Sequence, residues 1–466
     1  MKASVAIVGG GITGLTAAFT LLKQGADVTI FESQPSIGGL SATADFGVFR
    51  WDRFYHCILT SDESLLQLLD ELGLSSSLRW RTTEVGFYSR NALYRMTSPA
   101  DLLRFPCLSL AAKVRFGLGI LYAGRVCGGR GLEGRPLKDW IRQVFGETLL
   151  QEIWDPLLRC KLGDLRSEAS ASFLWSTIRR LYSTRTKGIE KKEQLGYVEG
   201  GYRTVLDRLV REVQSLGGQL HLGSALEQIE PTAGGVRLRG PGVDREYDSC
   251  LMTVPASVIL RMVPALSEDY QRRLKMPQYL GVVCLALVLR RQLSPYYLTN
   301  VTQEAPFTGV VEMTNLIDPA HNTNGFSLVY IPKYATPSDP LFQASDLEIW
   351  ECFSMSLFRM HPQLRGTDIV SKHVFRERFV QPVPTLYYSQ NAPAVETGVP
   401  HLFVANTTQI VNDTLNNNAM VQIARTACTV MMRSLRKQAD KHANEDAPAS
   451  IKPPSAERHL EESLQS

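Results

Sequence analysis

Residues 3–14 read Ala-Ser-Val-Ala-Ile-Val-Gly-Gly-Gly-Ile-Thr-Gly, and residues 27–32 read Asp-Val-Thr-Ile-Phe-Glu. The run before the glycines is apolar and β-branched, which predicts a strand. Apolar residues then recur at helical spacing as far as Gln24, and Gly25 ends the helix that they predict. A strand, the spacing G-x-G-x-x-G, a helix, a second strand and a terminal acid together form the dinucleotide-binding fingerprint in its required context.

Each part of this fingerprint has a physical role. Gly9 permits a tight turn out of the strand, Gly11 lets the backbone approach a pyrophosphate, and Gly14 lets the helix pack closely on the sheet. The unpaired N–H groups and the positive dipole end at the start of the helix suit a diphosphate. Glu32 can accept hydrogen bonds from both ribose hydroxyls, and its charge would repel a 2′-phosphate.

A second glycine pair, Gly38-Gly39, lies six residues beyond the acid and again brings backbone close to phosphate. An NAD-only dehydrogenase has no use for this pair. Together with residues 8–14 and Phe31-Glu32, it resembles the FAD-binding N-terminus of the flavin amine oxidase superfamily. That superfamily includes protoporphyrinogen oxidases, phytoene and squalene desaturases and UDP-galactopyranose mutases. The resemblance extends to about residue 435. It implies FAD as the cofactor, in a bacterial branch of FAD-dependent oxidoreductases related to protoporphyrinogen oxidase.

The resemblance also implies how the C-terminal part closes the FAD site. A strand near Leu226 passes the adenine, and a last strand ending in Asn406 precedes a helix that is opened by asparagine, a residue that caps helices. This branch often has Asp-Arg where the chain reads Asp413-Thr414, so we expect an arginine contact to the diphosphate to be missing. No cysteine follows the pattern of covalent attachment, which predicts non-covalent FAD. The residues expected to bind FAD are Gly9, Gly11, Ile12, Thr13, Gly14, Glu32, Ser33, Gly38, Gly39, Leu40, Leu226, Asn406, Leu415 and Asn416.

The chain of 466 residues has room for two or three domains. By resemblance, the fold class is α/β. It comprises a Rossmann-type FAD-binding domain built from discontinuous segments, a helical lid, and a mixed α+β substrate domain. We assign residues 1–60, 196–260 and 396–436 to the FAD-binding domain, 61–195 to the mostly helical lid, 261–395 to the substrate domain, and 437–466 to a polar, disordered tail.

The composition is that of an ordinary globular protein, with 44% hydrophobic and 21% charged residues. A net charge of +4 is too small to predict nucleic-acid binding. Cysteines and histidines are scattered without metal-ligand spacing, so we expect no metal site. The first strand begins by residue 3, which leaves no room for a signal peptide and favours a cytoplasmic protein.

Membrane contact is expected to be at most peripheral. No apolar run reaches the length of a membrane span. Residues 110–122 are apolar apart from Lys113 and Arg115, so they predict either a buried helix or one that lies on a membrane surface. We favour the buried helix.

Two candidate catalytic residues follow from the resemblance. Tyr55-His56 matches the aromatic-His ending of UDP-galactopyranose mutases, so His56 is either a polar group near the isoalloxazine or a histidine that caps a turn. Residues 154–164 resemble the Pro-Leu-Leu…Gly-Asp segment of protoporphyrinogen oxidase-like proteins. Within them Arg159 and Lys161 either bind an anionic substrate or are solvated cations. Many amine oxidases hold a water near N5 with a lysine on a central strand. Leu285 corresponds to that lysine, which argues against true amine oxidation.

The expected function is an FAD-dependent oxidoreductase that removes a hydride from a small organic substrate, anionic or apolar, at flavin N5. Oxygen or a quinone would reoxidise the flavin. One alternative is a flavin-dependent isomerase of a nucleotide-linked sugar, in which Arg159 would bind the diphosphate. A second alternative is a flavoprotein without turnover, kept for binding or assembly.

Overall fold

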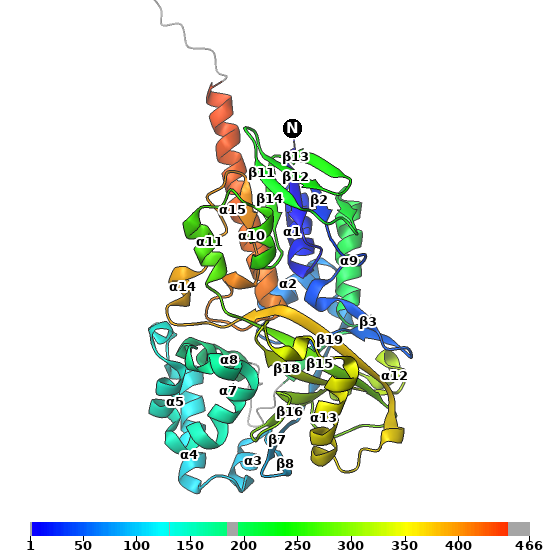
Figure 1. The fold of residues 1–466 in the computed structure, drawn as a ribbon, viewed down its shortest axis with the longest axis vertical. Coiled ribbons are helices and arrows are strands. Elements are labelled where there is room, and N and C mark those ends of the chain that lie inside the picture. The colour runs from blue at the N-terminus through cyan, green and yellow to red at the C-terminus, as the bar shows by residue number, and fades with distance from the viewer. Residues whose placement is uncertain (1, 130, 184–193, 446–466) are drawn as a thin grey trace, which may run out of the picture.

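A five-stranded parallel sheet organises one half of the molecule. The protein is described by a computed structural model that covers residues 2–129, 131–183 and 194–445 (Figure 1). Strands from three separate stretches of the chain pair in this sheet, all in parallel. In spatial order they are β10 (Gln219–His221), β2 (Asp27–Phe31), β1 (Ser4–Val8), β14 (Ser249–Met252) and β20 (Leu402–Val404).

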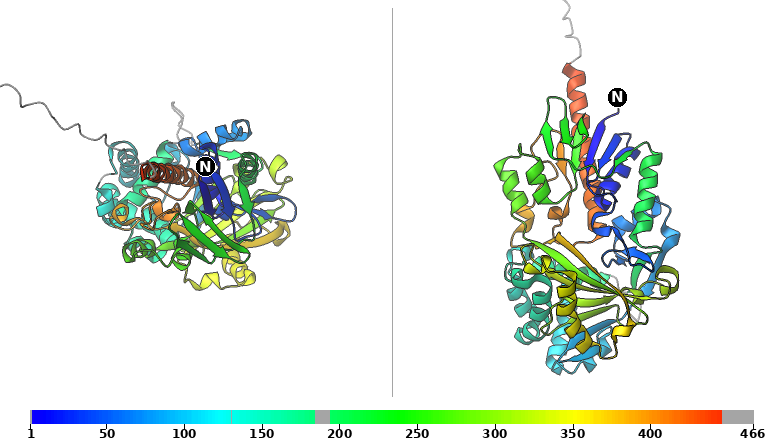
Figure 2. Two further views of the ribbon diagram at one scale, coloured as in Figure 1. Left: turned by 90° about the horizontal axis from the view of Figure 1, so that it is seen from above. Right: turned by 45° about the vertical axis from the view of Figure 1, so that its right-hand side comes forward.

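Both faces of the parallel sheet are covered, which explains why β1, β14 and β20 are buried at almost every residue. One face packs against four helices, α1 (Ile12–Lys23), α2 (Glu63–Glu71), α9 (Tyr202–Ser215) and α15 (Asn417–Glu445). On the other face lie α10 (Ala256–Met262), α11 (Glu268–Lys275) and an antiparallel sheet of β11 (Gln228–Pro231), β12 (Val236–Gly240) and β13 (Val243–Tyr247). The result is a three-layer arrangement (Figure 2).

A seven-stranded mixed sheet lies below the parallel sheet in Figure 1. Its longest strands are antiparallel neighbours, and β15 is buried at every residue. In spatial order the strands are β19 (Ile369–Pro382), β15 (Tyr279–Leu289), β18 (Ser327–Ala335), β17 (Gly309–Glu312), β16 (Leu298–Val301), β7 (Val85–Ser89) and β8 (Ala92–Arg95). One face packs on α13 (Asp346–Met360).

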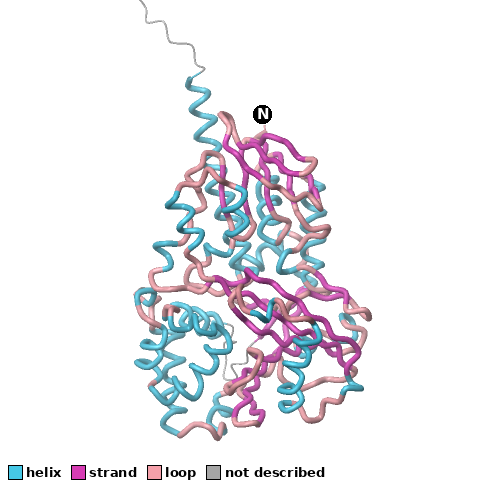
Figure 3. Tube along the Cα trace, viewed as in Figure 1, coloured by secondary structure: helices cyan, strands magenta, loops and turns pink. Residues whose placement is uncertain are grey.

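Shorter elements join these bodies. Two small antiparallel sheets pair β3 (Thr43–Asp45) with β4 (Arg50–Asp52), and β9 (Gln194–Val198) with both β5 (Ile58–Leu59) and β6 (Leu78–Thr82). A group of helices gathers beside the mixed sheet, at the lower left of Figure 3. They are α3 (Pro99–Arg104), α4 (Leu110–Leu121), α5 (Leu137–Phe145), α6 (Glu147–Leu149), α7 (Asp155–Leu162) and α8 (Ala171–Ser183). Two further short helices are α12 (Pro319–Asn322) and α14 (Tyr388–Asn391).

The α/β fold class expected from the sequence is confirmed, and several local predictions need correction. Residues 61–195 are helical over most of their described length, as expected, but they also contain strands β6, β7 and β8, of which β6 and β7 pair with the distant strands β9 and β16. The last helix does not end near residue 436 but continues to Glu445, so only residues 446–466 of the expected tail remain, and they lie outside the described residues. The division into domains stays a proposal.

The expectation that residues 110–122 form a buried helix is wrong. They form α4, of which Ala112 and Gly119 are buried while Leu110, Val114 and Leu118 are more than half exposed. The apolar residues therefore surround the helix, and only one face packs into the core. None of the helices in the described part of the chain is long and apolar enough to span a bilayer.

The packing of α1 on the first strand leads to a testable prediction. A Cβ atom added at Gly14 would overlap the carbonyl oxygen of Gly9, so Gly14→Ala must push the helix away from the turn. We expect it to lower the free energy of unfolding by about 1–3 kcal/mol, measured by urea denaturation. The control is Gly117→Ala in α4, where a Cβ meets nothing within 4 Å and a helical alanine should be neutral or stabilising. Equal stability of the two variants would contradict the close packing.

Candidate active site

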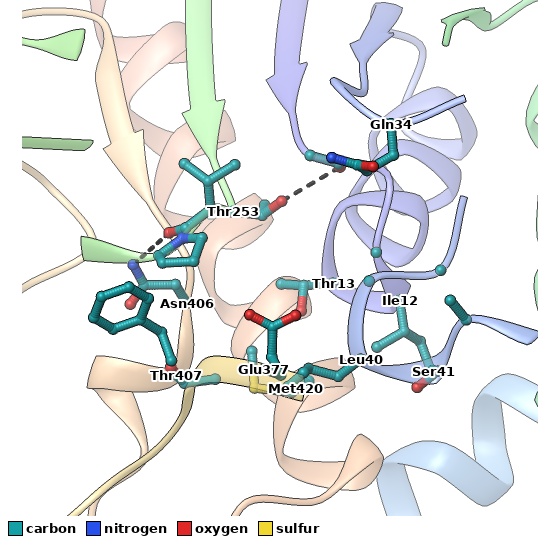
Figure 4. A pocket seen from close by; sticks show the side chains of 18 of the residues that line it. Ile12, Thr13, Gln34, Leu40, Ser41, Thr253, Glu377, Asn406, Thr407 and Met420 are labelled. Carbon is teal, nitrogen blue, oxygen red and sulfur yellow. Dashed lines mark hydrogen bonds between the residues drawn. The ribbon is translucent and has the colours of Figure 1, made fainter. Parts of the chain in front are cut away.

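A cavity of about 750 Å³ opens at the edge where the parallel strands end. Its lining includes the fingerprint turn, the loop with the second glycine pair, the ends of β14 and β20, the start of α15, and residues of the mixed sheet. Figure 4 shows Asn406 and Thr407 on one side and Ile12 and Ser41 on the other. Ligands of open parallel sheets bind at such a crevice beyond the carboxyl ends of the strands.

The two glycine loops are joined backbone to backbone. The Gly38 N–H donates to the carbonyl oxygen of Gly10 (3.0 Å), and Gly11 and Gly38 form an isolated parallel β-bridge. A Cβ at Gly11 would find its nearest atoms 4.0 Å away, on Gly38 and Gly39. It would therefore occupy the cavity rather than clash with protein. Both loops leave their backbone open to a ligand between them, as a diphosphate requires.

Glu32 lies at the cavity wall at the end of β2. Its carboxylate accepts hydrogen bonds from the N–H groups of Gly10 (2.6 Å) and Gln34 (2.8 Å). These bonds hold the side chain beside the fingerprint turn. Its remaining acceptor capacity is available to ribose hydroxyls.

Tyrosines line the end of the cavity near the mixed sheet. The Tyr55 and Tyr334 hydroxyl oxygens lie 2.8 Å apart and share a hydrogen bond. Burial raises the pKa of Tyr55 well above its ordinary value, and Tyr334 contributes to the rise. Burial likewise raises the pKa of Tyr334. Both phenols are therefore protonated at neutral pH, and Val282, Phe379 and the acidic Glu377 complete the wall beside them.

Three buried nitrogen atoms in the cavity lining make no hydrogen bond of normal geometry among the described residues, although His56 Nδ1 lies 3.5 Å from Asp52 and Asn417 interacts with Tyr202. They are Arg53 Nε, His56 Nδ1 and Asn417 Nδ2. Buried polar atoms are nearly always paired, so three such atoms around one cavity indicate a polar ligand that would satisfy them. FAD fits this requirement, because its diphosphate, ribityl and ring carbonyl oxygens accept hydrogen bonds.

Arg53 brings positive charge to the second glycine loop. It donates to the carbonyl oxygen of Gly39 (3.2 Å), and its Nη2 lies 3.6 Å from a carboxylate oxygen of Glu377. Burial lowers the pKa of Arg53, while Glu377 opposes that effect. The sequence reasoning missed this arginine. An arginine two residues before the Tyr55-His56 pair was the only available signal.

All but one of the residues expected to bind FAD line this cavity. The exception is Gly14, which lies behind the turn against Gly9. Asn406 and Asn416 also have structural tasks. The Asn406 side chain donates to the carbonyl oxygen of Val254 (2.9 Å), which ties the ends of β20 and β14, and Asn416 accepts from the Ala419 N–H (2.8 Å) and caps α15. Their contact with the cofactor stays a prediction.

The two candidate catalytic residues lie in different places. His56 lines the cavity, with Nδ1 3.5 Å from a carboxylate oxygen of Asp52. Arg159 does not line it. Its side chain is 66% exposed and forms an ion pair with Asp155 (3.1 Å). Lys161 turns inward instead, with Nζ 5.6 Å from the centre of the Phe173 ring, and burial lowers its pKa.

The structure also corrects the position assigned to the amine oxidase lysine. Leu285 packs in the core against α13, on the face of β15 that points away from the cavity. Side chains alternate along a strand, and Val282 and Cys284 occupy the face towards Tyr55. The cavity face of β15 still carries no lysine. Among the described residues, no group of three His, Cys, Asp or Glu side chains could hold a metal ion.

The geometry at Gly11 predicts that a substitution there can weaken FAD binding without disturbing the fold. Gly11→Ala adds a methyl group to the cavity without a clash, so we expect a folded protein whose bound FAD falls by about tenfold or more, a loss near 1.4 kcal/mol. Flavin absorbance per protein and circular dichroism measure the two effects. Gly234→Ala, where a Cβ meets nothing within 4 Å, is the control and should retain FAD. Full FAD content in Gly11→Ala would refute the proposed diphosphate position.

Comparison with known proteins agrees with this geometry. The protoporphyrinogen oxidase of Nicotiana tabacum is 25% identical over 196 residues, which cover 40% of this chain and 39% of that protein. The coproporphyrinogen III oxidase of Bacillus subtilis (strain 168) is 26% identical over 306 residues, 57% of this chain and 63% of that protein. The matches therefore span less than two thirds of both relatives.

Similarity in fold extends further. A crystal structure of reduced UDP-galactopyranose mutase superposes with a TM-score of 0.72 at 15% identity, over 93% of this chain and 96% of the mutase. The family model of flavin containing amine oxidoreductases matches residues 12–414, from the first residue of α1 to the loop before α15. The chain therefore belongs to the flavin containing amine oxidoreductase family.

Proposed function

We propose that the protein is an FAD-dependent oxidoreductase that removes a hydride from a small organic substrate in the chamber beside Tyr55 and Tyr334. The observation that carries this proposal is the continuity of one cavity. It joins the two glycine loops, where the dinucleotide would be held, to a chamber on the mixed sheet beside Tyr55, Tyr334 and Val282. When bound, FAD supplies a hydride acceptor at N5.

The chamber walls support catalysis by placement rather than by a strong base. Val282, Phe379 and the two protonated tyrosines offer the substrate apolar surface and hydroxyl groups. Holding a substrate in the reactive orientation and excluding water are large contributions to catalysis. The substrate would lose a hydride to the cofactor and a proton to solvent, and the electrons would pass on to oxygen or a quinone.

The main alternative is an isomerase of a nucleotide-linked sugar. His56 in the cavity lining favours it, because that residue supports the likeness to the mutases. Against it, Arg159 points to solvent and is paired with Asp155, so a sugar diphosphate would need another cation. Arg53, which lines the cavity, is a cation that would remain for that task.

The decisive measurement is anaerobic reduction of the bound flavin by substrate. The purified, FAD-loaded protein is mixed without oxygen with amines, porphyrinogens and polyisoprenoids in turn, and the visible flavin absorbance is followed. We expect one class to bleach it, and admission of air or a quinone to restore it with a stoichiometric oxidised product.

A variant pair ties that reaction to the chamber. Tyr55→Phe removes a hydrogen bond worth about 1 kcal/mol, so we expect flavin reduction to slow about fivefold at unchanged FAD content. The control is Tyr94→Phe, at a ring that packs on Phe105 away from the cavity. If no substrate bleaches the flavin but the reduced protein interconverts nucleotide-linked sugars, the isomerase is correct. Failure of both reactions would leave a flavoprotein without turnover.

A further inference from the structure

One stretch of the helical region exposes an unusual amount of apolar surface. Of the large apolar side chains exposed among the described residues, seven lie within 24 consecutive positions, whereas the others are scattered singly or in pairs. The members of this apolar stripe are Leu103, Leu110, Val114, Leu118, Leu121, Tyr122 and Val126, with 43–73% of their surface exposed. Single exposed apolar residues need no explanation, but a contiguous group marks an interaction site.

The stripe follows one side of a continuous helix. Leu110, Val114, Leu118 and Tyr122 are spaced four residues apart, so they lie above one another on α4 and on the turn of π-helix at residues 122–126. The opposite side of α4 is buried, at Ala112 and Gly119. Leu103 is added from α3, which packs beside α4. Both helices lie at the end of the molecule opposite the parallel sheet (Figures 1 and 2).

The charged residues within the stretch of chain that carries the stripe are all cations. Residues 102–132 contain no aspartate or glutamate, but they contain three arginines and a lysine among the described residues, at positions 104, 113, 115 and 125. The flanking acids are occupied elsewhere. Asp101 is buried in the cap of α3, and Glu133 accepts hydrogen bonds from Ser389 and Asn412. Arg142 of neighbouring α5 forms ion pairs with both Asp139 and Glu147.

We propose that the apolar stripe docks on an anionic lipid surface. A helix that combines an exposed apolar face with flanking cations and no acids has the composition of a segment that lies in a membrane interface. The apolar side chains would enter the acyl boundary, while the cations meet anionic headgroups, to which each cation near the surface adds attraction. The helix would lie on the bilayer without crossing it, in keeping with the absence of a spanning helix among the described residues.

Charge argues against a second copy of this chain as the occupant. In a two-fold dimer the same patch meets itself, so each stripe would bring its own cations against those of its partner. Such like-charge contacts are costly in an interface. An anionic surface has no such penalty.

The position of the stripe gives the docking a consequence for the active site. Phe116 and Ile120 on the inner side of α4 pack into the same core as Tyr334, which lines the chamber. Docking would therefore place the bilayer against a helical region that shares a packed core with one wall residue of the chamber.

Vesicle co-sedimentation tests the proposal with the FAD-loaded full chain. The vesicles are phosphatidylcholine alone or equal parts of phosphatidylcholine and phosphatidylglycerol. We expect binding to the mixed vesicles, at least about tenfold weaker binding to the neutral ones, and further weakening at high salt because screening removes the headgroup attraction. The proposal would be overturned if the same fraction of the wild-type chain sedimented with and without mixed vesicles.

Matched variants locate the surface. Val114→Asp with Leu118→Asp should reduce binding to mixed vesicles by about tenfold or more, because both charges would enter the apolar layer. The control is Leu347→Asp with Met355→Asp, equally exposed positions on α13 that should bind as the wild type. FAD content and circular dichroism verify that both variants fold. Equal loss in both pairs would overturn the assignment. A different result would also overturn the assignment. In it, light scattering shows that the wild type forms a concentration-dependent dimer, and only the α4 double variant is monomeric. That double variant still binds mixed vesicles as the wild type does.

Discussion

Parallel pairing of strands from distant parts of the chain is the constraint on which the rest of the structure depends. β1 pairs with β2 on one side and with β14 on the other, and β14 pairs with β20, so residues some 400 positions apart end at one edge. Parallel strands have their carboxyl ends together, and this brings the fingerprint turn, Glu32, Thr253 and Asn406 around one cavity. No local interaction could assemble that set.

Hydrogen bonds at this edge are used in two different ways. Some tie the strand ends to one another. The Thr253 hydroxyl donates to the Val8 carbonyl oxygen (2.9 Å), and the Asn406 amide donates to that of Val254. Others are left unmade within the protein, at Arg53, His56 and Asn417. The first group makes the rim of the cavity rigid, and the second is where a polar ligand gains its hydrogen bonds, because buried groups without partners are costly.

The mixed sheet gives the cavity its second half. β15 and β18 carry Val282 and Tyr334 to the chamber on one face, while their other face is buried against α13. The helical region packs on the mixed sheet through a core that includes Leu280 of β15. Its Arg180 forms an ion pair with Asp62 (3.1 Å), at the residue before α2, and so links α8 to the helices beside the parallel sheet. Burial raises the pKa of Asp62, and Arg180 opposes that rise. The region therefore has a polar connection to the cofactor half, and on its outer side it keeps a helix face that no part of the described chain covers.

The sequence by itself determined the cofactor half of the protein, because the fingerprint is a local pattern. Strand β2, the turn, Glu32 and the second glycine pair lie within 40 residues, and each has a spacing that a backbone-bound diphosphate requires. Long periodic elements such as β15 and α13 could also be predicted, since their apolar patterns are long. Only the tertiary structure decided the rest. The direction of Leu285, the exposure of α4, the solvent-facing Arg159 and the placement of Arg53 depend on which face of an element meets which neighbour. The apolar periodicity of an element does not specify which neighbour each face meets. A face that packs on protein and a face that stays exposed can contain the same kinds of apolar residue.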